Sequence, residues 1–138
     1  IQAHRGEYDR RLLETMIAAL QAGRPLLIAP EGGRSHTPGL RQGLPGVAYA
    51  ADKAAVPIIP VGVVGTTRDY FKRATHGERP PLEMRIGEPV HLPPVSGHGA
   101  ERRAALQKNT DLLMRHLAAL LPSEYRGVYG LSEPGEAR

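Results

Sequence analysis

Residues 29–35 read Ala-Pro-Glu-Gly-Gly-Arg-Ser and directly follow an apolar run, Leu-Leu-Ile, at 26–28. The run predicts a short buried strand over 26–29, so the loop that leaves it carries a carboxylate, two glycines and an arginine. Glycine lets a backbone approach a ligand closely, and the guanidinium of Arg34 offers a planar fork of donors that suits phosphate or carboxylate. Open α/β sheets keep their sites at the carboxyl ends of strands, so this stretch predicts an anion-binding loop. The alternative is a plain glycine turn in which Glu31 and Arg34 pair on the surface.

A second apolar stretch, Val-Pro-Ile-Ile-Pro-Val-Gly-Val-Val-Gly, occupies residues 56–65. It predicts a strand over 57–64, whose two prolines favour an edge position or a strand start. Residues 45–55 are small and apolar, with a proline near the first turn, and predict a helix between the two strands. This β-α-β order favours an α/β fold with a largely parallel central sheet flanked by helices.

Hydrophobic periodicity predicts the remaining elements. An amphipathic helix is expected over 8–22, where apolar residues recur with helical spacing and Gly23 and Pro25 end the pattern. Further expectations are a short helix or turn over 66–74, a strand over 82–86 and a long helix over 100–121 that Pro122 ends. A polar tail follows over 131–138.

Three blocks in this order resemble the 1-acylglycerol-3-phosphate acyltransferases, a family of glycerolipid acyltransferases. The family has a Phe-Pro-Glu-Gly-Thr-Arg-Ser block, a Phe-Lys-x-Gly element and a Val-Pro-Ile-Ile-Pro-Val block. Gly43 matches the second element, with Arg41 near the position of its lysine, and residues 56–61 match the third without a gap. The first block is matched at Pro30, Glu31, Gly32, Arg34 and Ser35, while Ala29 and Gly33 depart from it. Residues 121–129, Leu-Pro-Ser-Glu-Tyr-Arg-Gly-Val-Tyr, are similar to the C-terminal end of bacterial members.

The resemblance implies acyl transfer in phospholipid biosynthesis. The donor would be acyl-coenzyme A or acyl-carrier protein, and the acceptor the free hydroxyl of a lysophosphatidate-like lipid. The implied substrate-binding residues surround the acceptor's phosphate, and neither a metal nor a cofactor is implied. These residues are Arg5, Glu31, Gly32, Gly33, Arg34 and Arg41.

The family's catalytic base comes from a His-x-x-x-x-Asp pair several dozen residues before the Glu-Gly block. His4 and Asp9 have this spacing, but Asp9 lies only 22 residues before Glu31. Arg5-Gly6-Glu7 instead fits another family block, a strand that ends in an arginine. We therefore expect residues 1–130 to be a partial acyltransferase domain without its N-terminal part, carrying the phosphate-binding residues and inactive alone. His4 and Asp9 as the catalytic pair remain the alternative.

The composition agrees with an anionic partner. Hydrophobic residues make up 41% of the chain, which indicates a globular domain. The net charge of +4 favours an anionic membrane surface or an anionic acyl donor as partner. Aromatic residues are only 4% of the chain, so the stacking platforms of single-strand nucleic-acid binders are scarce and no nucleic-acid partner is expected. No stretch reaches the roughly 20 apolar residues of a spanning helix. The expected location is the cytoplasmic face of a membrane, held peripherally or through missing N-terminal residues.

Two alternatives stay open. A non-catalytic phosphate- or lipid-binding α/β module would use the same loop without a base. The cluster of Arg68, Tyr70, Phe71, Lys72 and Arg73 fits an anionic membrane surface, but it fits an ordinary solvated face equally well.

Overall fold

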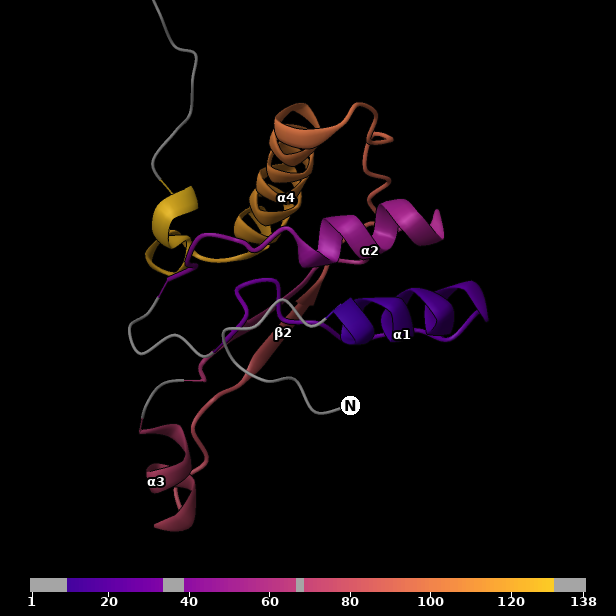
Figure 1. The fold of residues 1–138 in the computed structure, drawn as a ribbon. Coiled ribbons are helices and arrows are strands. Elements are labelled where there is room, and N and C mark those ends of the chain that lie inside the picture. The colour runs from indigo at the N-terminus through magenta and orange to yellow at the C-terminus, as the bar shows by residue number, and fades with distance from the viewer. Residues whose placement is uncertain (1–9, 34–38, 67–68, 131–138) are drawn as a thin grey trace, which may run out of the picture.

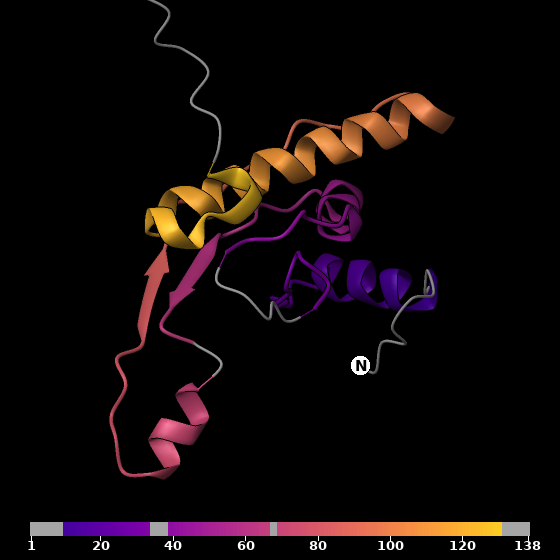
Figure 2. The same ribbon diagram turned by 90° about the vertical axis from the view of Figure 1, so that its left-hand side faces the viewer.

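The computed structural model describes residues 10–33, 39–66 and 69–130. In these residues helices dominate, and a small sheet lies at one end of the longest helix (Figures 1 and 2). The elements are α1 (Arg10–Gln21), α2 (Gly46–Ala54), β1 (Val61–Val64), α3 (Tyr70–Thr75), β2 (Glu83–Ile86), α4 (Gly99–Leu120) and two single turns of 3-10 helix, η1 (Ser123–Tyr125) and η2 (Gly127–Tyr129).

The first helix forms as its periodicity predicts. The apolar stripe of α1 is half-buried, and α1 lies alongside α2 (Figure 1). Gly23 adopts a positive φ of 74° and donates its N–H to the carbonyl of Leu20 at 2.9 Å, while Arg24 donates to Ala19 at 3.0 Å. These bonds satisfy carbonyls at the helix end and explain why the chain turns there.

The core lies between α2 and α4. Ala48 and Ala50 of α2 are buried, and their small side chains allow the two helices to approach closely. The facing side of α4 is buried at three of its leucines, Leu106, Leu113 and Leu117. Met114 is fully buried with them. Truncating such a side chain to alanine typically costs about 2–5 kcal/mol, so we expect this contact to contribute substantially to stability.

The sheet pairs β1 with β2 antiparallel, with Val61 opposite Ile86 and Val63 opposite Met84. One face, which carries Gly62 and Arg85, packs on the end of α4, where Arg85 Nη1 donates to the carbonyl of Leu120 at 2.9 Å. On the other face Met84 and Ile86 are about two-thirds exposed. A largely parallel central sheet stays a prediction, because the described residues contain this antiparallel pair and one isolated bridge.

The strand expected over 26–29 is wrong for the described structure. Within the described part of the chain these residues pair with no strand, and the side chain of Leu27 is 96% exposed. A strand exists only when a neighbour satisfies its backbone groups, and an apolar run alone does not supply one. The second strand is likewise shorter than expected, because only 61–64 of the predicted 57–64 pair in the sheet, with Ile58 joined to Val90 by the bridge.

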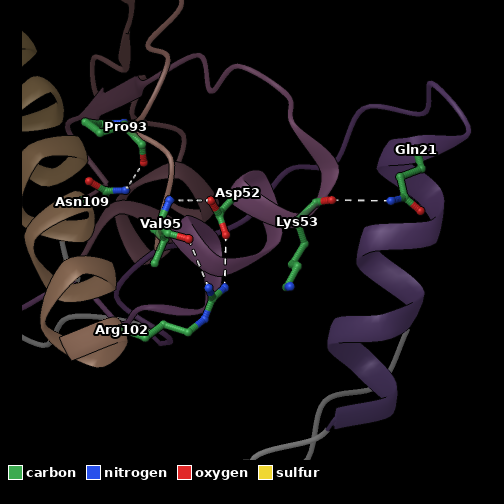
Figure 3. Close-up of polar contacts among 7 residues, drawn as sticks. All are labelled: Gln21, Asp52, Lys53, Pro93, Val95, Arg102 and Asn109. Atoms are coloured by element: carbon green, nitrogen blue, oxygen red, sulfur yellow. Dashed lines mark hydrogen bonds and ion pairs between the residues drawn. The ribbon is translucent and has the colours of Figure 1, made fainter. Parts of the chain in front are cut away.

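The segment between β2 and α4 is fastened to both core helices by polar contacts (Figure 3). Asp52 of α2 accepts the backbone N–H of Val95 at 2.9 Å and pairs with Arg102 of α4 at 3.2 Å. Asn109, which is buried on α4, donates to the carbonyl of Pro93 at 2.7 Å. These contacts satisfy polar groups that would otherwise be buried without partners.

The short helix α3 lies apart from the core. It connects the far ends of β1 and β2, and both views place it away from α1, α2 and α4 (Figures 1 and 2). The short helix or turn expected over 66–74 is confirmed here, although the helix itself spans Tyr70–Thr75.

Candidate anion-binding site

The loop after residue 29 and the loop before α2 are joined by Glu31 and Arg41. The Glu31 carboxylate accepts the backbone N–H of Arg41 at 2.8 Å. In return, Arg41 Nη2 donates to the Glu31 carbonyl at 3.2 Å, and Arg41 Nε lies 3.8 Å from the carboxylate. The side chain of Arg41 is 48% exposed and that of Glu31 only 19%. Glu31 therefore holds both the backbone and the guanidinium of Arg41, while half of the guanidinium side chain stays open to solvent.

Two glycines shape the turn beneath this pair. Gly32 has a positive φ of 68° and donates its N–H to the carbonyl of Ala29 at 3.1 Å, which closes a tight turn. A Cβ at Gly33 would lie 3.2 Å from Arg41 Nη2, so the absence of a side chain gives the guanidinium room to cross the turn. The sequence predicted glycines that permit a close approach, and the approaching group in the structure is Arg41.

Gly43 is needed for packing against α4. A Cβ on it would lie 2.7 Å from Met114 Cγ and 2.8 Å from Thr110 Cγ2, well inside ordinary contact distance. Leu44, the next residue, donates its N–H to the carbonyl of Pro30 at 2.8 Å and so ties the two loops together a second time. The glycine of the second sequence block thus keeps the loop that carries Arg41 pressed onto the long helix.

The far side of this loop contacts the C-terminal part of the described chain. Leu40 donates its N–H to the carbonyl of Tyr125 at 3.0 Å and accepts from the N–H of Val128 at 3.1 Å. Gly43 donates its N–H to the hydroxyl of Tyr129 at 3.1 Å. Tyr129 belongs to the segment that is similar to bacterial acyltransferases, but no local pattern predicts its contact with a glycine 86 residues away.

Tyr129 is held from a second direction by α4. Its hydroxyl donates to Asp111 Oδ1 at 3.1 Å, and Gln107 Nε2 donates to the same oxygen at 3.0 Å. Burial raises the pKa of the Tyr129 phenol, the hydrogen bond from the N–H of Gly43 lowers it by less, and the hydrogen bond to Asp111 raises it again. The phenol is therefore neutral at neutral pH and acts as both donor and acceptor.

The structure brings together four of the six predicted substrate-binding residues, namely Glu31, Gly32, Gly33 and Arg41. Arg5 and Arg34, the other two, lie outside the described residues, as do His4 and Asp9. The predicted surface pair of Glu31 with Arg34 therefore lies outside the described residues. The carboxylate of Glu31 pairs with another arginine, Arg41.

A groove of about 460 Å³ lies elsewhere, between the base of the sheet and the end of α4. It is mostly apolar, and Pro60, Val90 and His116 contribute to its wall. None of the predicted site residues lines it. Over 10–33, 39–66 and 69–130, no group of three or more His, Asp or Glu side chains is arranged to hold a metal ion, and no helix is long and apolar enough to cross a membrane.

Residues 1–64 match the Acyltransferase family model. The match supports an acyltransferase, and with it acyl transfer from a donor to a lipid acceptor as the general chemistry. It includes Glu31, Arg41 and Gly43, so the joined loops fall inside the matched region. It ends at β1, so α4 and Tyr129 lie beyond it. A search of solved structures returned no match to this chain.

Proposed function

We propose that this chain provides the acceptor-binding part of a glycerolipid acyltransferase, which moves an acyl group from acyl-coenzyme A or acyl-carrier protein to the hydroxyl of a lysophosphatidate-like acceptor. The observation that carries the proposal is the Glu31–Arg41 pair, which holds a half-exposed guanidinium over a glycine turn. A guanidinium fixed in this way meets a phosphate without first losing much side-chain freedom, which favours binding.

The proposed acceptor site combines Arg41 with Arg34 and Arg5. Arg34 follows the Gly32–Gly33 turn directly in sequence, so its charge lies within a few residues of Arg41's partner Glu31. Each charge-assisted hydrogen bond to a phosphate is worth about 1.5–3 kcal/mol. Glu31 has a positioning role, because its carboxylate is used by Arg41 and its own charge would repel a phosphate.

The chemical step needs a base that these residues do not supply. Among the described residues near Arg41, none is a histidine in contact with the pair. We therefore assign binding and not proton transfer to this site. The proposed setting is the cytoplasmic face of a membrane, where both amphiphilic substrates reside, and the proposed complete fold retains a largely parallel sheet.

A non-catalytic lipid-phosphate module remains the second candidate function. The same Glu31–Arg41 geometry favours it, since binding a phosphate requires no base. The two candidates differ in the acyl donor, because only an acyltransferase has a reason to bind a thioester.

The acceptor site is tested by binding to the purified chain. The probes are a short-chain lysophosphatidate, the matching monoacylglycerol that lacks the phosphate, and acyl-coenzyme A. Arg41→Ala and Arg34→Ala should each weaken lysophosphatidate binding by roughly tenfold to hundredfold, the equivalent of one charge-assisted contact. Binding of the monoacylglycerol should barely change.

Arg24→Ala is the matched control, because Arg24 is an exposed arginine that precedes the same loop. It should leave all three dissociation constants unchanged. If Arg41→Ala weakens the binding of lysophosphatidate and of monoacylglycerol equally, Arg41 has a folding role and the phosphate site is refuted. Absence of acyl-coenzyme A binding in the unaltered chain would favour the non-catalytic module.

A further inference from the structure

The loop that carries Arg41 is fastened on one side to the Glu31 turn and on the other side to the end of the described chain. We propose that Tyr129 is a positioning residue for the acceptor site, whose hydroxyl fixes the backbone of residues 41–43 and so holds Arg41 beside Glu31. This inference rests on the proposed function and adds to it a residue outside the region that matches the family model.

The hydroxyl of Tyr129 makes two hydrogen bonds, one as acceptor and one as donor. It accepts the N–H of Gly43 at 3.1 Å and donates to Asp111 Oδ1 at 3.1 Å. Gln107 lies one helical turn before Asp111 and donates to that same oxygen at 3.0 Å. This chain of hydrogen bonds therefore connects the loop to α4, a helix of the core.

The backbone supports the same contact. The two hydrogen bonds of Leu40 to residues 125 and 128 set the segments side by side (Figure 1, purple beside yellow). Gly127 has a positive φ of 54°, and a Cβ there would overlap the backbone of Leu40. Residues 125–129, Tyr-Arg-Gly-Val-Tyr, therefore place both their own backbone and the phenol of Tyr129 against the loop.

The contact reaches Arg41 through a short path. Gly43 is only two residues from Arg41, is buried, and fits closely against Met114 and Thr110. Loss of the hydroxyl would take away the acceptor of the Gly43 N–H, and we expect residues 41–43 to move in search of another partner.

The test compares Tyr129→Phe with Tyr125→Phe. Both variants remove one phenolic hydroxyl from the same segment, but within the described part of the chain the Tyr125 hydroxyl has no hydrogen-bond partner. Hydrogen exchange at the amides of 41–43 reports on the loop. The ratio of lysophosphatidate to monoacylglycerol dissociation constants reports on the site.

Tyr129→Phe should speed hydrogen exchange at the amides of 41–43. It should also weaken lysophosphatidate binding by about threefold to tenfold, the usual effect of one lost hydrogen bond, and leave monoacylglycerol binding unchanged. Tyr125→Phe should change neither quantity. If Tyr129→Phe fails to fold, Asp111→Ala removes the acceptor of the phenolic O–H while it keeps the phenol, and it should shift both readouts in the same direction.

Faster exchange in Tyr129→Phe with an unchanged selectivity ratio would overturn the positioning role, because it would show that the phenol stabilises the loop without serving the site. Unchanged exchange would overturn the contact itself. A selectivity ratio near one in the unaltered chain is a different result, since it refutes the phosphate site and thereby the inference that depends on it.

Discussion

In the proposed anion site, Glu31 would hold Arg41 in place without itself touching the anion. Glu31 accepts the backbone N–H of Arg41 at 2.8 Å and lies beside its guanidinium. Two effects of this carboxylate on a bound phosphate oppose one another. Its charge repels the phosphate, while its hydrogen bonds keep the arginine in place.

Replacement of Glu31 by glutamine decides between these effects. A unit charge about 4 Å away contributes only about 1 kcal/mol in water-like surroundings, whereas a hydrogen bond to a charged group is worth about 1.5–3 kcal/mol. Positioning should prevail, so Glu31→Gln should weaken lysophosphatidate binding although it removes a negative charge. Titration calorimetry measures the change, and tighter binding would show that repulsion dominates.

At the scale of elements, the approach of the Arg41 loop to α4 depends on Gly43. A methyl group there would meet Met114 and Thr110 at distances below 3 Å. Both side chains are fully buried on α4 and have little freedom to move.

We expect Gly43→Ala to lower the free energy of unfolding by about 1–3 kcal/mol, as overpacking of a close-fitted core does. Gly46→Ala is the control, since a Cβ at that first residue of α2 has nothing closer than 3.9 Å and alanine favours the helix. Urea denaturation of both variants gives the comparison. Equal stability of Gly43→Ala and the unaltered chain would mean that the loop is free to move off α4.

The surface of α3 is the part of the described chain that we predict to contact an anionic membrane. Phe71 is 79% exposed and its ring meets that of Tyr70 edge to face. Lys72 is exposed, whereas Arg73 Nε donates to Glu78 at 2.6 Å, a hydrogen bond that raises the pKa of Arg73 and offsets its charge locally. Arg68, the third cation of the cluster, lies outside the described residues.

Neutralising Arg68, Lys72 and Arg73 together should weaken binding to anionic vesicles at low salt by about 3 kcal/mol at most, at about 1 kcal/mol per cation. The pairing of Arg73 with Glu78 reduces its share. Neutralising Arg10, Arg11 and Arg24 removes the same charge beside α1 and should have a smaller effect. Vesicle co-sedimentation measures the binding of both triple variants. If both lose the same affinity for anionic vesicles, the effect comes from net charge alone and the cluster has no special role.

At the scale of the whole molecule, catalysis depends on whether a base reaches the acceptor hydroxyl. His4–Asp9 is the only His-x-x-x-x-Asp pair in the sequence, and it lies closer to Glu31 than the family resemblance implies. The 138 residues should therefore release little coenzyme A from an acyl thioester when supplied with lysophosphatidate.

A thiol-release assay measures this directly, with heat-treated protein as the background. Release well above that background, and its loss in His4→Ala, would establish His4 as the base and contradict the assignment of binding alone. Release that persists in His4→Ala would instead indicate a different base within the chain.

The sequence by itself determined the helices and the turn residues. The stripe of α1 and the glycine turns at 23 and 32 follow from local preferences that each residue carries into any fold. Block spacing also selected Glu31, Gly32, Gly33 and Arg41, which the structure does bring together.

Only the tertiary structure decided which groups meet. It paired Glu31 with Arg41, left Leu27 exposed, joined β1 to β2 antiparallel and placed Tyr129 on Gly43. Such contacts join residues as far as 86 positions apart. Their energies depend on the distances that the packed helices impose, and no local pattern encodes those distances.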